Sequence, residues 1–158
     1  DDAMVNPDIE EECDGIDNDC DGDIDAAELC PCEFEQYEDS SYLFCLDMRS
    51  WFIAKGECEN TGYHLITVND VDEDEWLDDM IDSYSTSRWW AGFNDLTVEN
   101  YWDWDGPFTQ FFNWGIGQPT GGTDKNCTAI HLSTIGNWEW VDGDCYTPHK
   151  FICETDLP

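Results

Sequence analysis

The 158-residue sequence predicts an α+β domain with an antiparallel sheet, preceded by a separate acidic arm. Two segments between residues 47 and 84 carry apolar residues at helical spacing, and later segments alternate with a period of two. A chain that runs from helices to strands is typical of the α+β class. We therefore expect two regions, an arm at residues 1–31 and a folded domain at residues 32–158.

The arm contains a periodic run of carboxylates that matches the twelve-residue calcium loop of an EF-hand. If Asp17 takes the first position, oxygen ligands fall at every position where the loop needs one, and Gly22 falls at the sharp turn. The predicted calcium ligands are Asp17, Asp19, Asp21, Asp23, Asp25 and Glu28. Because alternate side chains of such a loop converge on one ion, the spacing predicts a calcium site that stiffens the arm.

The residues that flank this loop do not favour the long helices of an EF-hand, because Pro7 precedes it and Cys30-Pro31-Cys32 follows it. The loop instead resembles those of dockerins, thrombospondin type-3 repeats and acidic metal-binding repeats of bacterial surface proteins. Oxygen ligands without His favour calcium over copper. The alternative is an acidic disordered tail that binds no metal. Cys13 and Cys20 could close a ring at the loop entrance, and Cys30 could pair within the arm, stay free or bridge to another chain.

Two helices are predicted at the start of the domain. The first runs from about Asp47 to Asn60, and its buried face, spaced i, i+3 and i+7, consists of Trp51, Ala54 and Cys58. The second is capped by Asn69 or Asp70, and acidic residues in its first turn suit the helix dipole. Its predicted buried stripe consists of Leu77, Met80, Ile81 and Tyr84.

Four later segments alternate with a period of two and are predicted to be strands. They are Tyr101–Asp105, Thr128–Leu132, Trp138–Trp140 and Phe151–Cys153. Between Asp105 and Cys127 the chain is rich in Gly, Pro, Asn and Gln and has little regular pattern. A loop of this length in a compact domain is usually functional or mobile, so we expect a binding site there.

The composition restricts the compartment and the partners. The net charge is −33, with 5 Lys and Arg against 38 Asp and Glu, which excludes nucleic acid and anionic membranes as partners. Carboxylates at this density need divalent cations or high ambient salt, and composition does not separate these two. Nine cysteines indicate an oxidising, extracellular compartment. The chain has no run of about 20 apolar residues that could span a bilayer and no signal peptide pattern, so we expect any signal peptide to have been removed already.

Four segments of the domain together resemble the C-type lectin-like family over residues 32 to 155. They are Trp51–Cys58, Trp90-Ala-Gly-Phe93, Gln118-Pro-Thr120, and Cys127–Cys153 with its Trp140-Val-Asp142. The resemblance implies two helices, antiparallel sheets, a first strand at Tyr42–Phe44 and a long ligand loop. It also implies the disulfides Cys58–Cys153 and Cys127–Cys145, and Cys32–Cys45 as the N-terminal pair of longer members.

In sugar-binding members of that family, a Glu-Pro-Asn or Gln-Pro-Asp triplet, a Glu before a cysteine, and an Asn-Asp pair hold calcium and sugar. Here Lys125 stands where the Glu is expected, and Val141 replaces the Asn. The remaining ligand-loop candidates are Gln118, Thr120, Asp124, Asp142 and Asp144, of which Asp124 and Asp144 require a shifted backbone. Asp95 and Glu99 match an auxiliary calcium position of collagen-containing lectins. Asn126-Cys127-Thr128 is a glycosylation sequon, with Asn126 as the acceptor.

These features predict an extracellular recognition or adhesion module with a calcium-rigidified arm. We also expect a role as a subunit of a surface assembly or filament. Its partner would be a glycan or a protein on a surface, and self-association through the arm is an added expectation. Two alternatives are a calcium-dependent lectin with a rearranged site and a purely structural, disulfide-stapled subunit. No nucleophile motif and no zinc spacing are present among His64, His131 and His149, so we expect no enzyme.

Overall fold

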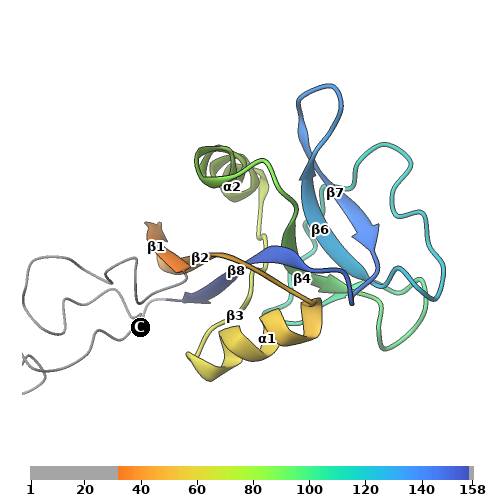
Figure 1. The fold of residues 1–158 in the computed structure, drawn as a ribbon, viewed down its shortest axis with the longest axis horizontal. Coiled ribbons are helices and arrows are strands. Elements are labelled where there is room, and N and C mark those ends of the chain that lie inside the picture. Colours follow the sequence, from red (N-terminus) through yellow and green to blue (C-terminus); the bar gives the residue numbers. More distant parts are fainter. Residues whose placement is uncertain (1–31, 157–158) are drawn as a thin grey trace, which may run out of the picture.

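A computed structural model describes residues 32–156. The chain order of its elements is β1 Cys32–Tyr37, β2 Ser40–Arg49, α1 Trp51–Asn60, β3 His64–Leu65, α2 Val71–Tyr84, β4 Trp89–Asn94, β5 Asp103–Trp104, β6 Cys127–Leu132, β7 Trp138–Gly143 and β8 His149–Asp156. Two helices and a sheet confirm the α+β class. Figure 1 shows the sheet between the two helices, with α2 on one side and α1 on the other.

The described strands form one sheet in the order β1-β2-β8-β4-β6-β7, with β3 added to β8 and β5 added to β4. Antiparallel pairing was predicted throughout, and one pair departs from it. Strand β4 lies parallel to β8, with Trp89 opposite Lys150 and Trp90 opposite Phe151. The last strand of the chain therefore inserts between β2 and β4, and it joins the N-terminal half of the sheet to the half that carries the long loop.

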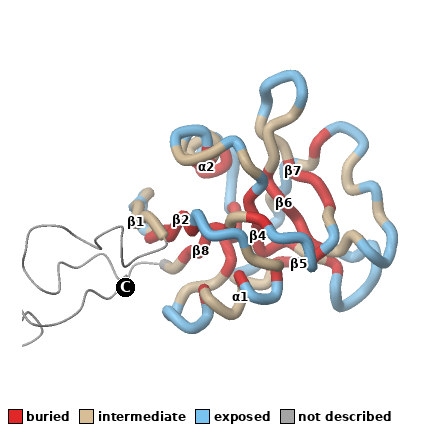
Figure 2. The backbone as a smooth tube through the Cα atoms, in the orientation of Figure 1, coloured by how far each residue is buried: buried red, intermediate tan, exposed pale blue. Residues whose placement is uncertain are grey.

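Side chains of each central strand alternate between the two faces, and each face has its own hydrophobic core. Neighbouring residues such as Trp89 and Trp90 lie in different cores. The core under α2 contains Tyr42, Phe44, Leu77, Ile81, Trp89, Phe93, Trp104, Trp140 and Ile152. The core under α1 contains Leu43, Trp51, Ala54, Cys58, Trp90, Val141 and Phe151. Figure 2 shows these central strands as the buried part of the molecule.

Both helices bury the faces that the sequence predicts, although α1 starts later than expected. Its buried residues are Trp51, Ala54 and Cys58, as predicted. The start at Asp47 was wrong, because β2 continues to Arg49 and Arg49 pairs with His149 of β8. Helix α2 begins after Asp70, whose side chain accepts hydrogen bonds from the amides of Asp72 and Glu73. Of the predicted stripe of α2, Leu77 and Ile81 are buried, and Met80 and Tyr84 pack against the core.

The first turn of α2 contains buried carboxylates that the sequence did not predict. Glu73 is 4 % exposed and accepts hydrogen bonds from the Tyr42 hydroxyl and the Asn69 amide, both at 2.7 Å. Burial raises the pKa of Glu73, and the hydrogen bonds from Tyr42 and Asn69 oppose that rise. This carboxylate therefore joins α2 to β2 through neutral donors rather than through an ion pair.

Three disulfides connect the described cysteines, and they are the three pairs that the family resemblance implied. Cys32–Cys45 joins β1 to β2, Cys58–Cys153 joins α1 to β8, and Cys127–Cys145 joins the start of β6 to the segment after β7. The second pair closes 95 residues of chain and so removes the most conformational entropy from the unfolded state, worth about 4–5 kcal/mol in the chain-entropy model.

Candidate functional site

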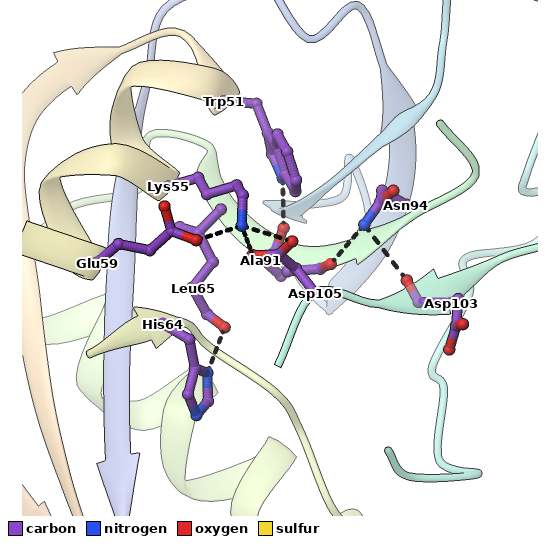
Figure 3. Close-up of polar contacts among 10 residues, drawn as sticks. Trp51, Lys55, Glu59, His64, Leu65, Ala91, Asn94, Asp103 and Asp105 are labelled. Atoms are coloured by element: carbon purple, nitrogen blue, oxygen red, sulfur yellow. Dashed lines mark hydrogen bonds and ion pairs between the residues drawn. The ribbon is translucent and has the colours of Figure 1, made fainter. Parts of the chain in front are cut away.

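The long loop lies between β5 and β6, and within its described residues, 105–126, there is no helix or strand. Of the predicted strand Tyr101–Asp105, only Asp103 and Trp104 pair with β4, so the loop starts directly after them. Its first residue is held by α1, since Lys55 Nζ lies 2.8 and 2.6 Å from the two carboxylate oxygens of Asp105 (Figure 3). The Asp105 amide also donates to the Gly92 carbonyl at 3.0 Å.

A glycine in β4 allows this strand to lie very close to the segment after β3. A Cβ atom on Gly92 would lie 2.9 Å from the Leu65 carbonyl oxygen, closer than real contacts allow. The missing side chain lets the Gly92 amide donate to the Ile66 carbonyl at 2.9 Å. The glycine of the Trp90-Ala-Gly-Phe93 motif is therefore required by the close approach of β4 to the segment after β3.

The middle of the loop runs beside β7. The Trp140 amide donates to the Asn113 carbonyl at 3.1 Å, and the Gly115 amide donates to the Trp140 carbonyl at 2.9 Å. These two bonds fix the loop before the Gln118-Pro119 peptide, which is cis. They bring the predicted ligand residues 118 and 120 to the same edge as Asp142 of β7.

The residues at this edge bond to one another. Asp142 is 6 % exposed, and Thr120 Oγ1 lies 2.9 Å from both of its carboxylate oxygens. The Gly121 amide donates to Asp142 Oδ2 at 2.7 Å, and the Asp142 amide donates to Gln118 Oε1 at 3.4 Å. Lys125 Nζ in turn donates to Thr120 Oγ1 at 2.9 Å. We call these five residues, Gln118, Thr120, Gly121, Lys125 and Asp142, the loop network.

The loop network does not fit calcium. Calcium in proteins takes six to eight oxygen ligands, and the network offers one carboxylate, one amide oxygen and one hydroxyl. The ammonium of Lys125 is bonded to that hydroxyl, so a second cation at the same point would be repelled. Among residues 32–156, no group of three or more Asp, Glu, His or Cys side chains is arranged to hold a metal ion.

The remaining acidic candidates lie apart from the loop network. Asp144 Oδ1 accepts a hydrogen bond from the Tyr146 amide at 2.9 Å, and Asp124 is exposed. Both line a cavity of about 200 Å³ beside Phe52 and Tyr146. Asp95 is 3 % exposed and accepts from the Asn100 amide at 2.8 Å, whereas Glu99 is exposed. Calcium binding by Asp95 and Glu99 stays a prediction.

The predicted glycosylation acceptor, Asn126, is half-buried and lies directly before β6. When its side-chain amide is oriented with the nitrogen inward, that nitrogen donates to Asp95 Oδ1 and to the Gly122 carbonyl, each at 3.3 Å. Glycosylation there stays a prediction. The arm ligands Asp17, Asp19, Asp21, Asp23, Asp25 and Glu28, and the cysteines Cys13, Cys20 and Cys30, lie outside the described residues.

Three comparisons with known proteins agree with this geometry. A family model described as "Lectin C-type domain" matches residues 47–155. The chain belongs to the C-type lectin domain family. Perlucin of Haliotis laevigata is 33% identical over 134 residues, which are 80% of this chain and 83% of perlucin. A perlucin-like protein of Mytilus galloprovincialis is 31% identical over 129 residues, 78% of this chain and 81% of its own length.

A solved structure that contains a sugar has the same fold. The SPL-1–GlcNAc complex superposes with a TM-score of 0.70 at 30% identity and covers 82% of this chain and 98% of that chain. This C-type lectin domain is therefore a lectin-like recognition module. Neither the family nor these relatives indicates an enzyme. Within residues 32–156, no helix is long and apolar enough to cross a membrane.

Proposed function

We propose that this C-type lectin domain is an extracellular recognition and adhesion module whose loop network binds its ligand without calcium. The observation that carries the proposal is the ammonium of Lys125, which donates to Thr120 at the position where a lectin of the sugar-binding pattern would need a metal ligand. Thr120 donates in turn to Asp142 of β7, so protein side chains hold the loop against β7. Nine cysteines favour the extracellular location.

The ligand class in this proposal is a glycan or a protein on a surface. A glycan is favoured by the relationship to SPL-1, whose structure contains GlcNAc. In the absence of a metal, recognition would rest on hydrogen bonds and on aromatic side chains of the loop. Phe108 and Phe112 of the loop are 74% and 60% exposed, and Tyr101 just before it is 66% exposed.

The arm has a separate role in this proposal. The spacing of the acidic ligands from Asp17 to Glu28 supports a calcium loop that makes residues 1–31 a stiff connection. Calcium would then act on the arm and leave ligand binding by the loop unchanged. Self-association through the arm would make the protein a subunit of a surface assembly or filament.

A glycan array with the full chain tests the proposal, once in calcium and once in a chelator. We expect the same glycans to bind in both conditions, with affinities within about two-fold of each other. Binding that disappears in the chelator and returns with calcium would instead identify a calcium-dependent lectin with a rearranged site. An empty array, together with calcium-dependent growth of particles in light scattering, would identify a purely structural subunit.

A gain-of-function variant tests the reason for calcium independence. The triple substitution Thr120→Asp, Lys125→Glu and Val141→Asn restores the Gln-Pro-Asp, Glu and Asn-Asp pattern of sugar-binding members. We expect isothermal titration calorimetry to find one more calcium ion per full-length chain than in the parent protein. The affinity should lie in the weak range of extracellular modules, with a Kd of roughly 10⁻⁴–10⁻³ M. If the calcium count does not change, the three residues are not what prevents calcium from binding.

A further inference from the structure

A cleft of about 530 Å³ lies apart from the loop network, between α2, the loop at residues 113–116 and the β6–β7 hairpin. Figure 1 shows α2 and this hairpin on the same side of the sheet, and Figure 2 shows the hairpin tip as exposed. None of the five residues of the loop network lines the cleft. Whatever binds there would be recognised by different chemistry.

Four carboxylates line the cleft, and one of them is held by hydrogen bonds. They belong to Asp74, Glu75, Asp78 and Glu139. Asp74 is 4 % exposed, and it accepts hydrogen bonds from Trp140 Nε1 at 3.0 Å and from Asn113 Nδ2 at 2.6 Å. Glu139 lies against Gly115, where a Cβ atom would be 2.7 Å from its carboxyl carbon. The glycine therefore lets the Glu139 side chain cover the loop backbone at the wall of the cleft.

No described Lys or Arg forms an ion pair with these carboxylates. Within residues 32–156, the ion pairs are formed by Arg49 and Lys55, and their partners lie outside the cleft. Lys125 bonds to Thr120, and Lys150 lies over the Trp89 ring. Arg88, the remaining cation, is exposed and does not line the cleft. The donors that hold Asp74 are an indole and an amide, which orient the carboxylate and leave its charge uncancelled.

Asp78 is affected both by its burial at the cleft and by the neighbouring negative charges. Burial raises the pKa of Asp78 to about 7, and the charges of Asp74, Asp79 and Glu75 add to the rise. A neutral sugar would leave these charges without compensation when it displaced their water. A metal ion is disfavoured as well, because no three of the described acidic side chains converge on one point. The cleft therefore suits an organic cation.

The rim of the cleft is apolar. Ile116 is 98% exposed, Ile135 is 76% exposed and Val71 is 53% exposed, and all three line the cleft. The half-buried rings of Trp114 and Trp138 line it too, and an aromatic ring attracts a cation. An acidic interior with an apolar rim complements a long side chain that ends in a positive charge, flanked by apolar neighbours.

We propose that this cleft binds a Lys or Arg side chain of a protein partner, presented in a basic segment with apolar residues on either side. The cation lies among the carboxylates, and the flanking side chains cover Ile116, Ile135 and Val71. The inference goes beyond the proposed function of the loop network, because it rests on residues outside that network. Variants of Lys125 should leave this binding unchanged.

Isothermal titration calorimetry of the full chain with the peptide acetyl-Ile-Arg-Ile-Arg-Ile-amide tests the proposal, at about 0.15 M salt to screen the distant charges. The cleft variant Asp78→Asn with Glu139→Gln should weaken binding at least ten-fold. The matched control, Asp72→Asn with Asp82→Asn, removes two carboxylates from exposed positions of α2 outside the cleft and should weaken binding less than two-fold. The rim variant Ile116→Ser should weaken binding about three-fold, and its exposed position makes an effect on folding small.

Three results would overturn the proposal. Equal weakening by the control pair would mean that the peptide responds to the general field of the protein. Equal binding of a peptide with citrulline in place of arginine would mean that charge is not recognised. Competition by glucosamine at the same concentration as the peptide would assign the cleft to an amino sugar.

Discussion

Two buried carboxylates beside the same loop, Asp142 and Asp74, differ in what balances their charge. They are 6% and 4% exposed, and each receives two short hydrogen bonds from side chains or loop amides. The donor at Asp142 is itself bonded to Lys125, so a cation belongs to that site. The donors at Asp74 are neutral, and none of the described Lys or Arg side chains bonds to the cleft carboxylates.

The comparison shows that satisfying hydrogen bonds and balancing charge are separate requirements. Both carboxylates are satisfied as acceptors, so both are compatible with a stable fold. The charge balance then decides which ions or partner side chains each site can bind. A site with its own ammonium has no need of calcium, and a site without one can attract a cation from a partner.

The largest effect should come from removing the carboxylate at Asp74. The substitution Asp74→Ala leaves the indole N–H of Trp140, which is 1% exposed, without an acceptor. We expect a loss of about 2 kcal/mol in the free energy of unfolding, since an orphaned buried donor costs about 1–3 kcal/mol. Urea denaturation of the full chain measures this loss.

Asp72→Ala is the matched control for that experiment. Asp72 lies in the same first turn of α2, is exposed, and contributes to the helix dipole without bonding to the loop. It should cost less than about 1 kcal/mol. An equal loss from both variants would mean that Asp74 acts only through the helix dipole, and the contrast with Asp142 would then be lost.

The sequence predicted the scaffold better than the charge environments. The spacing of Trp51, Ala54 and Cys58 is local, so the buried face of α1 could be read directly from it. The burial of Asp74 depends on Trp140, 66 residues away, and on Asn113, 39 residues away. An acidic residue in a first helical turn is normally solvent-exposed, and nothing local distinguishes one that folding buries.

The candidate site was predictable only where the local sequence pattern was sufficient. The family pattern located Thr120, Lys125 and Asp142, and the charge of Lys125 indicated a poor calcium site. The pattern did not reveal that Lys125 would donate to Thr120, because a substitution at a ligand position does not specify its new partner. The cleft could not be predicted, since its walls come from three segments that only the fold brings together.

A middle-sized effect should appear in the pH dependence of stability. The pKa of Asp78 is about 7 in the folded chain and about 3.8 in the unfolded chain. Between these values the folded chain binds more protons, so its stability falls as the pH rises from about 4 to 7. Asp78→Asn removes this loss and should stabilise the protein by about 1–2 kcal/mol at pH 8, after allowance for solvent screening. Near pH 4 the two proteins should be equally stable.

Thermal unfolding at pH 4, 6 and 8 measures this divergence. Asp82→Asn is the control, because it removes a carboxylate from an exposed position on α2 whose charge does not act on Asp78. It should shift the melting temperature of the protein by a similar amount at pH 6 and pH 8. If Asp78→Asn shows the same flat difference, burial and the neighbouring charges do not raise the pKa of Asp78, and the contrast between the cleft and the loop network loses this support.

The smallest effect should come from Lys125→Met, which removes the cation of the loop network and keeps a side chain of similar length. Thr120 can still donate to Asp142, so we expect a loss of only about 0.5–1 kcal/mol, typical of one partly exposed hydrogen bond. Arg88→Met, which removes one charge from an exposed position, is the control for the general effect of net charge. Calorimetry should find no additional calcium in Lys125→Met, because Thr120 and Val141 still supply too few oxygens. An added calcium ion in this single variant would mean that Lys125 alone keeps calcium out, and that the network is otherwise an intact metal site.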